Sequence, residues 1–319
     1  MEAPLTLSVV IVTYQREQVL TDTIAQLLPQ IDQTAGALEL LVIDQTADHL
    51  PETQAALSQW AQSHRIRWLR LPEPHLTHAM NLGLLEAEGD VVLYVDDDIR
   101  PQPNLLQNHL AVYSRKPEVW AVVGQVIQPG EQPETLTYQP KGSFLFRYMD
   151  FPFRSTIPSY IENAMAGNLS VRRNRAMELG GFDENFTPPV AARFESEFAK
   201  RLVRAGGRIW FEPGASIHHL AAPSGGIRSQ GSHLNSALPI FGIGDYYFAL
   251  RQGRGWERLW YILRKPFREV RTRFHLRHPW WIPVKLLGEI RAFSGALRLY
   301  RVGPKFLDQS DQGKHSWPP

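Results

Sequence analysis

The chain of 319 residues is 43% hydrophobic and 21% charged, with a formal net charge of +2, which excludes a protein that is disordered throughout. It has no cysteine, so disulfide scaffolds, thiolate metal sites and a thiol nucleophile are also excluded. The length suits one large α/β domain with an appendage. We find neither a basic and apolar leader nor an apolar stretch long enough to cross a bilayer, so we expect a cytoplasmic protein.

Short apolar runs alternate with helical patterns over the first 130 residues. The runs are rich in β-branched and large apolar side chains, as strands are, and comprise Leu7–Thr13, Leu38–Asp44, Ile66–Leu71, Val91–Asp96 and Val119–Ile127. This order predicts a mostly parallel, Rossmann-like α/β sheet flanked by helices. Neither of the usual glycine-rich phosphate loops occurs, so a phosphate group would have to be bound in another way.

Polar residues end several of these strands. Thr13 and Tyr14 close the first strand, Asp44 ends the second, and the three carboxylates Asp96–Asp98 end the fourth. Open α/β sheets bind ligands outside the carboxyl ends of their strands. Three neighbouring carboxylates repel one another, and a hard divalent cation that also holds a diphosphate would relieve this repulsion. We therefore expect the chemistry at this edge of the sheet.

Six segments, taken in chain order over about residues 7–219, resemble the family-2 glycosyltransferases, which have the GT-A fold. The segments are Val9–Arg16, Leu41–Asp44, Ala79–Gly83 with Ala87–Asp90, Leu93–Asp98 with Pro103, Gly180–Glu184, and Glu195–Phe198 with Arg201. Each segment alone is weakly diagnostic, but their order and spacing together indicate the family. One departure is Met80, where related sequences usually carry an arginine.

The resemblance implies that the first half of the chain binds a nucleoside-diphosphate sugar. The acidic triplet matches the DxD motif of the family, so Asp98 would ligate Mn²⁺ or Mg²⁺ on the donor diphosphate. Asp96 and Asp97 would contact the ribose or the water shell of the metal, with Asp96 also a candidate ligand. An imidazole at His219 would complete the metal site. The further donor-binding candidates are Thr13, Tyr14, Arg16, Asp44 and Asn81.

Inverting glycosyl transfer needs a base for the acceptor hydroxyl, and the resemblance places that base at the start of a helix. We expect a helix over Phe194–Ala205 with Glu195 as the base. Glu197 lies roughly 200° further around the helix, so only one of the two acids can point into the cleft, and we expect Glu197 to pair with Arg201, four residues on. We assign Glu197 to the acceptor side of the site. Both acids would also suit a first helical turn for electrostatic reasons alone. Asn168 is a further candidate on the acceptor side.

Charge and aromatic content change near residue 228. Residues 228–319 hold 16 Lys and Arg against 6 Asp and Glu, with five of the nine tryptophans, whereas residues 1–227 hold 18 against 26. An apolar stripe at helical spacing is formed by Val284, Leu287, Ile290, Phe293, Leu297 and Tyr300. The stripe would lie on an anionic membrane or pack on the catalytic domain or a second subunit. The glycine-containing run Ser224–Arg228 suits either a mobile lid or an ordinary turn.

Together these features predict a catalytic domain at residues 1–227 and a basic, aromatic, helical segment at 228–319 that associates with a membrane or packs on the domain. Within the domain, residues 1–129 would bind the nucleotide sugar and 130–227 the acceptor. The predicted reaction is metal-dependent, inverting transfer of a sugar to a hydroxyl of a glycan or lipid-linked acceptor, as in cell-surface polysaccharide synthesis. The protein would be cytoplasmic or peripheral on the inner membrane face, and we expect no nucleic acid as partner.

Two alternatives to this function stay open from the sequence. A non-catalytic protein on the same fold could bind a sugar nucleotide or a membrane. A sugar-phosphate nucleotidyltransferase also uses a parallel sheet and a metal, but it would want a glycine-rich, basic loop after the first strand. Thr13–Glu17 does not provide such a loop.

Overall fold

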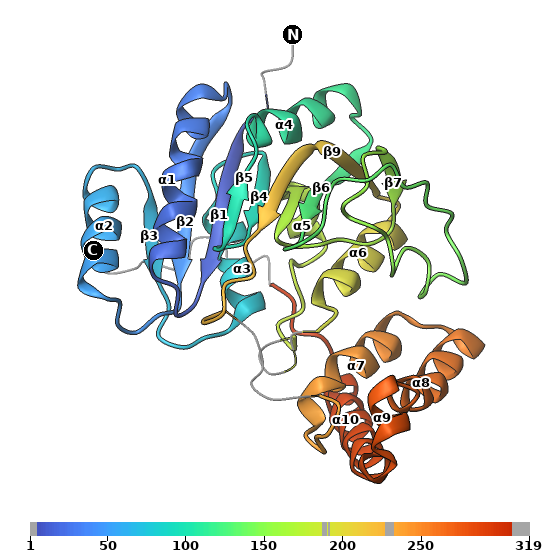
Figure 1. The fold of residues 1–319 in the computed structure, drawn as a ribbon. Coiled ribbons are helices and arrows are strands. Elements are labelled where there is room, and N and C mark those ends of the chain that lie inside the picture. Colours follow the sequence, from blue (N-terminus) through green and yellow to red (C-terminus); the bar gives the residue numbers. More distant parts are fainter. Residues whose placement is uncertain (1–4, 187–189, 191, 227–232, 308–319) are drawn as a thin grey trace.

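A computed structural model describes residues 5–186, 190, 192–226 and 233–307 of the chain. Its centre is a sheet in the order β3-β2-β1-β4-β8-β6-β9-β5, with β7 paired to β9 (Figure 1). The strands are β1 (Leu7–Thr13), β2 (Ala37–Asp44), β3 (Arg67–Arg70), β4 (Val91–Val95), β5 (Ile99–Pro101), β6 (Val119–Ile127), β7 (Ser159–Ile161), β8 (Asn168–Arg172) and β9 (Arg208–His219). The predicted α/β fold with a mostly parallel sheet and flanking helices is confirmed.

Strands β1 to β4 form the parallel half of the sheet. Their register pairs Thr13 with Asp44, and Ile11 with Val95, so β1, β2 and β4 end at nearly the same level. The acidic run Asp96–Asp98 follows β4 directly at this edge. Strand ends that lie far apart in the sequence therefore meet at the carboxyl edge, where a ligand of this fold class would bind.

The other half of the sheet is mixed. Strand β8 runs antiparallel between β4 and β6, and β9 runs parallel to β6 with an irregularity between Gly124 and Gln125 of β6. The long strand β9 ends in antiparallel pairing with β5, which sets His219 opposite Ile99. This pairing carries a histidine from late in the chain to the end of the acidic run.

Helices cover both faces of the sheet. They are α1 (Gln18–Gln33), α2 (Pro51–Gln62) and α4 (Leu105–Arg115) on one face, and α3 (Leu76–Glu86), α5 (Arg173–Glu178) and α6 (Phe194–Arg204) on the other. Strand side chains alternate between the two layers, so Val10 packs in one core while Val9 and Ile11 pack in the other. The site is thus built on the edge of a sheet that is buried on both faces.

The C-terminal helices pack as a group against the α6 side of the sheet (Figure 1). They are α7 (Ile243–Gln252), α8 (Gly255–Val270), α9 (Arg273–Arg277) and α10 (Ile282–Val302). The Tyr247 hydroxyl of α7 donates to Asp183 Oδ2 at 2.7 Å. After α10 the chain returns to the same loop, where the Leu307 N–H donates to the Gly180 carbonyl and the Glu184 N–H to the Lys305 carbonyl, both at 2.9 Å. The C-terminal helices are therefore fastened to the loop before α6 both near their start and after their end.

Helix α10 turns only part of the predicted apolar stripe inward, since Phe293 and Tyr300 pack against the core. Its buried residues are Lys285, Gly288, Glu289, Ala292 and Ala296, whereas Leu287 and Ile290 of the stripe are exposed. Small side chains allow close approach, and the buried charges are paired, since Lys285 Nζ lies 3.0 Å from Glu289 Oε1. Among the described residues, no helix is both long and apolar enough to traverse a membrane.

Candidate active site

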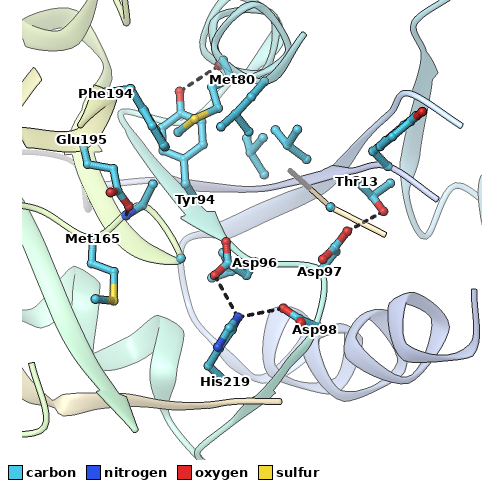
Figure 2. Close-up of a pocket in the computed structure, with 18 of the residues that line it drawn as sticks. Thr13, Met80, Tyr94, Asp96, Asp97, Asp98, Met165, Phe194, Glu195 and His219 are labelled. Atoms are coloured by element: carbon cyan, nitrogen blue, oxygen red, sulfur yellow. Dashed lines mark hydrogen bonds and ion pairs between the residues drawn. The ribbon is translucent and has the colours of Figure 1, made fainter. Parts of the chain in front are cut away.

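A cavity of about 560 Å³ lies at the carboxyl edge of the sheet (Figure 2). Its lining comes from the ends of β1, β4 and β9, from the start of α6, and from Ile240 in the short 3-10 helix Pro239–Phe241. It collects the predicted site residues Thr13, Tyr14, Arg16, Asp96, Asp97, Asp98, Glu195 and His219. Most of the residues that the sequence singled out are therefore brought together in one place.

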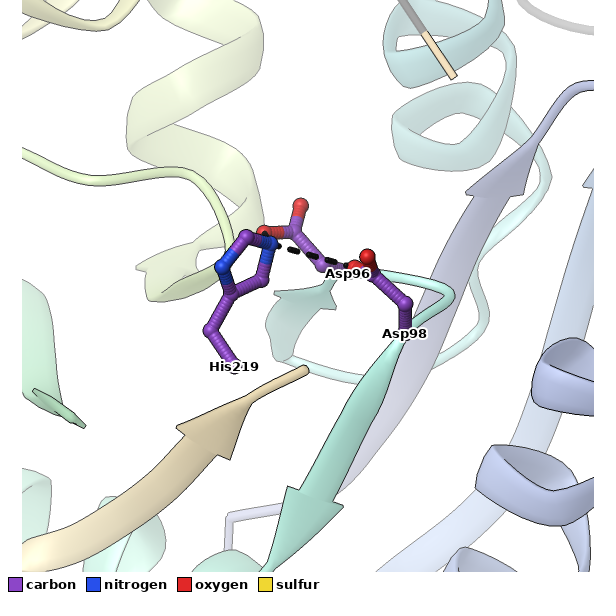
Figure 3. A group of neighbouring side chains, drawn as sticks. All are labelled: Asp96, Asp98 and His219. Carbon is purple, nitrogen blue, oxygen red and sulfur yellow. Dashed lines mark ion pairs between the residues drawn. The ribbon is translucent and has the colours of Figure 1, made fainter. Parts of the chain in front are cut away.

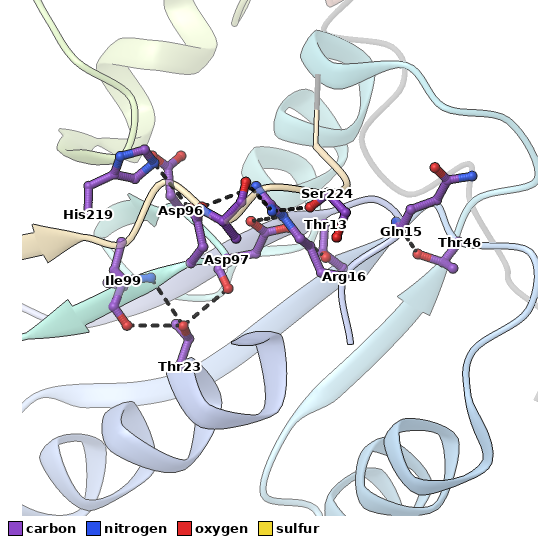
Figure 4. A network of polar contacts seen from close by, with 12 residues as sticks. Thr13, Gln15, Arg16, Thr23, Thr46, Asp96, Asp97, Ile99, His219 and Ser224 are labelled. Atoms are coloured by element: carbon purple, nitrogen blue, oxygen red, sulfur yellow. Dashed lines mark hydrogen bonds and ion pairs between the residues drawn. The ribbon is translucent and has the colours of Figure 1, made fainter. Parts of the chain in front are cut away.

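The last two carboxylates of the acidic run are held by β1 and the loop behind it. The Thr13 hydroxyl donates to Asp97 Oδ2 at 2.7 Å. Arg16 reaches both acids, with Nε 3.2 Å from Asp97 Oδ1 and a terminal nitrogen 3.1 Å from Asp98 Oδ2. The Ala222 N–H also donates to Asp98 Oδ2 at 2.8 Å. These contacts orient the carboxylates at the base of the cavity (Figure 4).

Asp96, Asp98 and His219 offer ligand atoms that all lie within 4.8 Å of one another (Figure 3). His219 Nε2 is 3.2 Å from Asp98 Oδ1 and 3.8 Å from Asp96 Oδ2. On the far side of the ring, Nδ1 lies 2.9 Å from Gln128 Oε1. An amide oxygen only accepts hydrogen bonds, so Nδ1 carries a proton, and Nε2 is the ring nitrogen that faces the carboxylates.

The charges in this cluster are crowded in a way that a cation would relieve. Desolvation in the cavity, together with the nearby Asp98 and Glu195 carboxylates, raises the pKa of Asp96 to about 6. Burial raises the pKa of Asp97 to about 7, against the opposing effect of Arg16. For Asp98 the cost of burial is outweighed by His219, Ala222 and Arg16, and its pKa is lowered. Two carboxylate oxygens and an imidazole nitrogen form a donor set that fits Mn²⁺ or Mg²⁺.

Arg16 also fixes the segment that was predicted as a lid or a turn. Its guanidinium donates to the carbonyls of Ala222 and Ser224, and the Gly226 N–H donates to the Tyr14 carbonyl at 2.8 Å. The segment up to Gly226 is therefore docked on the loop after β1, as Figure 4 shows for Ser224. The remaining residues of the predicted lid, including Arg228, lie outside the described residues.

Glu195 lies in the first turn of α6 and faces the cavity from the side opposite β1 (Figure 2). Its Oε1 accepts the Ala166 N–H at 2.7 Å, which fixes the orientation of the carboxylate. Burial raises the pKa of Glu195, although the Ala166 hydrogen bond and the nearby Arg193 oppose this. Arg193 precedes the helix in the left-handed conformation with φ of 76°. Such a carboxylate is suited to accept a proton near neutral pH.

Asp44 and Asn81, both predicted to bind the donor, do not line the cavity. The carboxylate of Asp44 is fully buried and accepts from the Thr46 N–H at 2.9 Å, from the Trp68 indole at 3.0 Å and from His49 at 2.8 Å. Asn81 is buried as well, and it exchanges hydrogen bonds with the backbone of Phe182. The two side chains are thus engaged inside the protein, Asp44 beside β3 and Asn81 under the loop before α6.

Asn168 and Glu197, assigned to the acceptor side, also lie away from the cavity. Asn168 is fully buried and bonds to His109 and to the carbonyls of Gln125 and Ala215. Glu197 has no exposed surface, and its pairing with Arg201 is confirmed, with Arg201 Nε 2.9 Å from Oε1. The contacts of both residues are those of side chains that hold the fold together.

Several lining residues were not found from the sequence. They are Gln45, Met165, Arg193 and Ile240. Gly167 leaves room for the acidic cluster, because a Cβ there would lie 2.2 Å from Asp96 Oδ2. Arg193 could have been predicted to lie near the cavity because it directly precedes Phe194 and Glu195, whereas no pattern in the sequence indicated Ile240.

A mostly parallel sheet with an acidic cluster and a buried carboxylate at its carboxyl edge is the arrangement of a glycosyltransferase of the GT-A type. The family model described as "Glycosyl transferase family 2" matches residues 8–173, more than half of the chain. The chain therefore belongs to glycosyl transferase family 2 and is a glycosyltransferase.

Its relatives are distant in sequence. A glucosyl-dolichyl phosphate glucuronosyltransferase from Haloferax volcanii is 22% identical over 228 residues, 66% of this chain and 68% of the relative. Among solved structures, GalNAc-T7 with UDP, GalNAc and Mn²⁺ aligns with a TM-score of 0.56 at 15% identity, over 85% of this chain and 58% of that chain. TarS from S. aureus gives 0.56 at 13% identity, over 85% and 45%.

A third solved structure covers more of both chains. The mannosyltransferase PcManGT from Pyrobaculum calidifontis, in complex with GDP-Man and Mn²⁺, aligns with a TM-score of 0.50 at 17% identity, over 94% of this chain and 80% of that one. These structural likenesses establish the shared GT-A fold.

Proposed function

We propose that the chain transfers a sugar, with inversion and with the help of a divalent cation, from a nucleoside diphosphate to an acceptor hydroxyl. One observation carries the proposal: a buried carboxylate, Glu195, faces the same cavity as the ligand group of Asp96, Asp98 and His219. A transferase of this kind needs both a base beside the acceptor and a charged site beside the leaving diphosphate.

In this proposal Glu195 accepts the proton of the acceptor hydroxyl. Its raised pKa matches the task of a base near neutral pH, and the Ala166 N–H keeps Oε1 oriented. Attack by that hydroxyl on the face of the sugar opposite the departing diphosphate gives inversion. A cation held by Asp96, Asp98 and His219 would supply positive charge for the leaving diphosphate, as Mn²⁺ or Mg²⁺ does in such sites.

The donor nucleotide would lie along the end of β1. Thr13 and Tyr14 line the cavity there, and Asp97 and Arg16 lie at its base. Asp44 stays a predicted contact of the donor base, although that base would have to compete with Thr46, His49 and Trp68 for its carboxylate. Gln45 is the neighbour that already lines the cavity.

For the acceptor we propose a hydroxyl on a lipid-linked sugar or a glycan, as in the assembly of cell-surface polysaccharides. The name of the Haloferax relative describes transfer to glucosyl-dolichyl phosphate, which is a lipid-linked sugar. The excess of 16 basic over 6 acidic residues in residues 228–319 would favour an anionic membrane, consistent with a peripheral protein on an inner membrane face.

The experiment is a donor panel of UDP-, GDP- and dTDP-sugars in which release of nucleoside diphosphate is followed with Mn²⁺, with Mg²⁺ and with EDTA. Lipid extract serves as the source of acceptor. We expect one donor to turn over, Asp98→Asn to reduce metal-dependent turnover, and Glu195→Gln to abolish transfer while donor binding persists. Binding without turnover in wild type and Glu195→Gln alike would favour a non-catalytic role, and neither binding nor turnover with any donor would refute the assignment of the donor site.

A further inference from the structure

Helix α8 exposes its apolar side. Five large apolar residues are each between 44 and 71% exposed, namely Trp256, Leu259, Trp260, Leu263 and Phe267. Their spacing of three or four residues places them on one side of the helix, which we call the α8 face. Large apolar side chains grouped on one exposed side of a helix are a feature of binding surfaces.

The opposite side of α8 is anchored by polar contacts. The Tyr261 hydroxyl donates to Asp245 Oδ1 at 2.9 Å. Lys265 is buried, with Nζ 3.2 Å from Glu289 Oε2 of α10 and 3.4 Å from Glu269 Oε1. A helix that buries a paired lysine and exposes tryptophans would lose these ion pairs if it rotated, so the outward orientation of the α8 face is fixed by the fold.

Exposed basic groups accompany the α8 face. The arginines of α8, of its ends and of α9 that are exposed are Arg254, Arg264, Arg268, Arg271, Arg273 and Arg277. The two acids of α8 are engaged, because Glu257 Oε1 accepts the Leu145 N–H and Glu269 pairs with Lys265 and Lys285. The surface around the α8 face is therefore positively charged.

We infer that the α8 face rests on an anionic lipid bilayer, with its apolar side chains at the acyl boundary and its arginines at the lipid phosphates. Interfacial helices combine a strongly apolar side, tryptophans and basic flanks in this way. Charge selects the bilayer over a second copy of the chain, since pairing two such surfaces would bring like charges together. The inference deepens the proposed function and rests on it, because a lipid-linked acceptor would be presented at the same membrane.

Contacts through intermediate residues connect α8 with elements that line the cavity. The 3-10 helix that contributes Ile240 to the cavity packs on α10, and α10 contacts α8. Arg193, also in the lining, has its Nε 2.9 Å from Asp245 Oδ1, the atom that Tyr261 of α8 also contacts. A bilayer at the α8 face would thus be linked to the cavity lining through α10 and the 3-10 helix, and through Asp245.

The test is flotation of the full chain, without donor or acceptor, with vesicles of phosphatidylcholine alone or mixed with phosphatidylglycerol. The matched pair is Leu263→Glu on the α8 face and Leu50→Glu before α2, which are 49 and 57% exposed. We expect wild type and Leu50→Glu to float with the anionic vesicles only, and Leu263→Glu to bind about tenfold or more weakly. Arg264→Gln should weaken binding about fivefold, with a smaller salt dependence.

Wild type that fails to bind anionic vesicles, or a Leu263→Glu variant that binds like Leu50→Glu, would overturn the inference. Light scattering adds a separate arm: wild-type dimers that Leu263→Glu converts to monomers would overturn it in favour of self-association. Release of nucleoside diphosphate in lipid-free solution should be equal for wild type and Leu263→Glu. A wild type that turns over donor but does not bind anionic vesicles then refutes only the membrane surface, whereas absence of turnover in wild type refutes the proposed function.

Discussion

Gly167→Ala should weaken the metal site while leaving the fold intact. Gly167 has no positive φ, so alanine fits its backbone, but the new Cβ would lie 2.2 Å from Asp96 Oδ2. Real Cβ contacts are not shorter than 3.0 Å, so the Asp96 carboxylate must move by at least about 0.8 Å. A displacement of about 1 Å in a reacting constellation costs on the order of a hundredfold in rate. Because Asp96 borders the cavity, its side chain can move into that space, and the free energy of unfolding should change by less than about 0.5 kcal/mol.

The assay is release of nucleoside diphosphate as a function of Mn²⁺ concentration, beside urea unfolding. We expect the half-saturating Mn²⁺ concentration to rise about 10- to 100-fold. Gly214→Ala is the control, since its Cβ would lie 3.1 Å from Glu212 Oε1, outside the cavity. Wild-type Mn²⁺ dependence in Gly167→Ala, or a loss of activity that only follows a loss of stability, would refute the reasoning.

Three further predictions concern residues behind the cavity. Asn168→Ala should lower the free energy of unfolding by about 3 kcal/mol in urea titrations, because the buried carbonyls of Gln125 and Ala215 would lose their hydrogen-bond donor. An unchanged stability with a raised KM for the acceptor would instead support the predicted acceptor-side role of Asn168. Glu197→Gln should cost about 3 kcal/mol by leaving Arg201 without its carboxylate, with near-normal turnover in the folded fraction, and a stable but inactive variant would contradict this. Burial lowers the pKa of His109 to about 4, so the unfolded chain takes up a proton below pH 6.5 that the folded chain refuses, and up to about 3 kcal/mol of stability is lost as the pH falls from 6.5 to 4. His109→Gln should remove that part of the pH dependence, and an unaltered slope would show that another group causes it.

The order of the sheet and the acidic edge were predictable because they depend on local patterns. Runs of β-branched residues predicted β1, β2, β4 and β6, and polar residues at strand ends predicted where the ligand groups gather. His219 was found through the resemblance. Its arrival at Asp98 depends on the pairing of β9 with the three-residue strand β5, which is too short to leave a periodic signal.

The direction of a side chain at a strand end was not predictable. Thr13 and Asp44 end paired neighbouring strands in register, yet Thr13 lines the cavity and Asp44 is sealed by Trp68 and His49. Trp68 of β3 and His49 of the loop after β2 hold the Asp44 side chain away from the cavity. These contacts are non-local, so the sequence pattern around Asp44 does not predict them. The same reason removes Asn168 from the cavity, because His109 of α4 occupies the space beside it.

In the C-terminal segment the predicted apolar stripe of α10 holds only in part, because Phe293 and Tyr300 pack on the core while Leu287 and Ile290 are exposed, and the α8 face was not predicted. A prediction from hydrophobic spacing assumes that the buried side of a helix is apolar. Helix α10 instead buries Lys285 and Glu289, which form an ion pair with each other. Glu289 also pairs with Lys265, and Lys285 with Glu269. The tryptophans at 256 and 260 were counted in the sequence, but their place on one side of a helix becomes apparent once Tyr261 and Lys265 are seen to point inward.

The double attachment of the C-terminal helices has a geometric consequence. Tyr247 near their start and residues 303–307 after their end both hold the loop Gly180–Glu184. These two attachments, together with the packing of α7 on α6, restrict the movement of α8 relative to Glu195. If α8 rests on a bilayer, the distance between the membrane surface and the cavity would be restricted. Acceptors would then be chosen by how far their reactive hydroxyl reaches from the lipid anchor, as well as by the sugar that carries it.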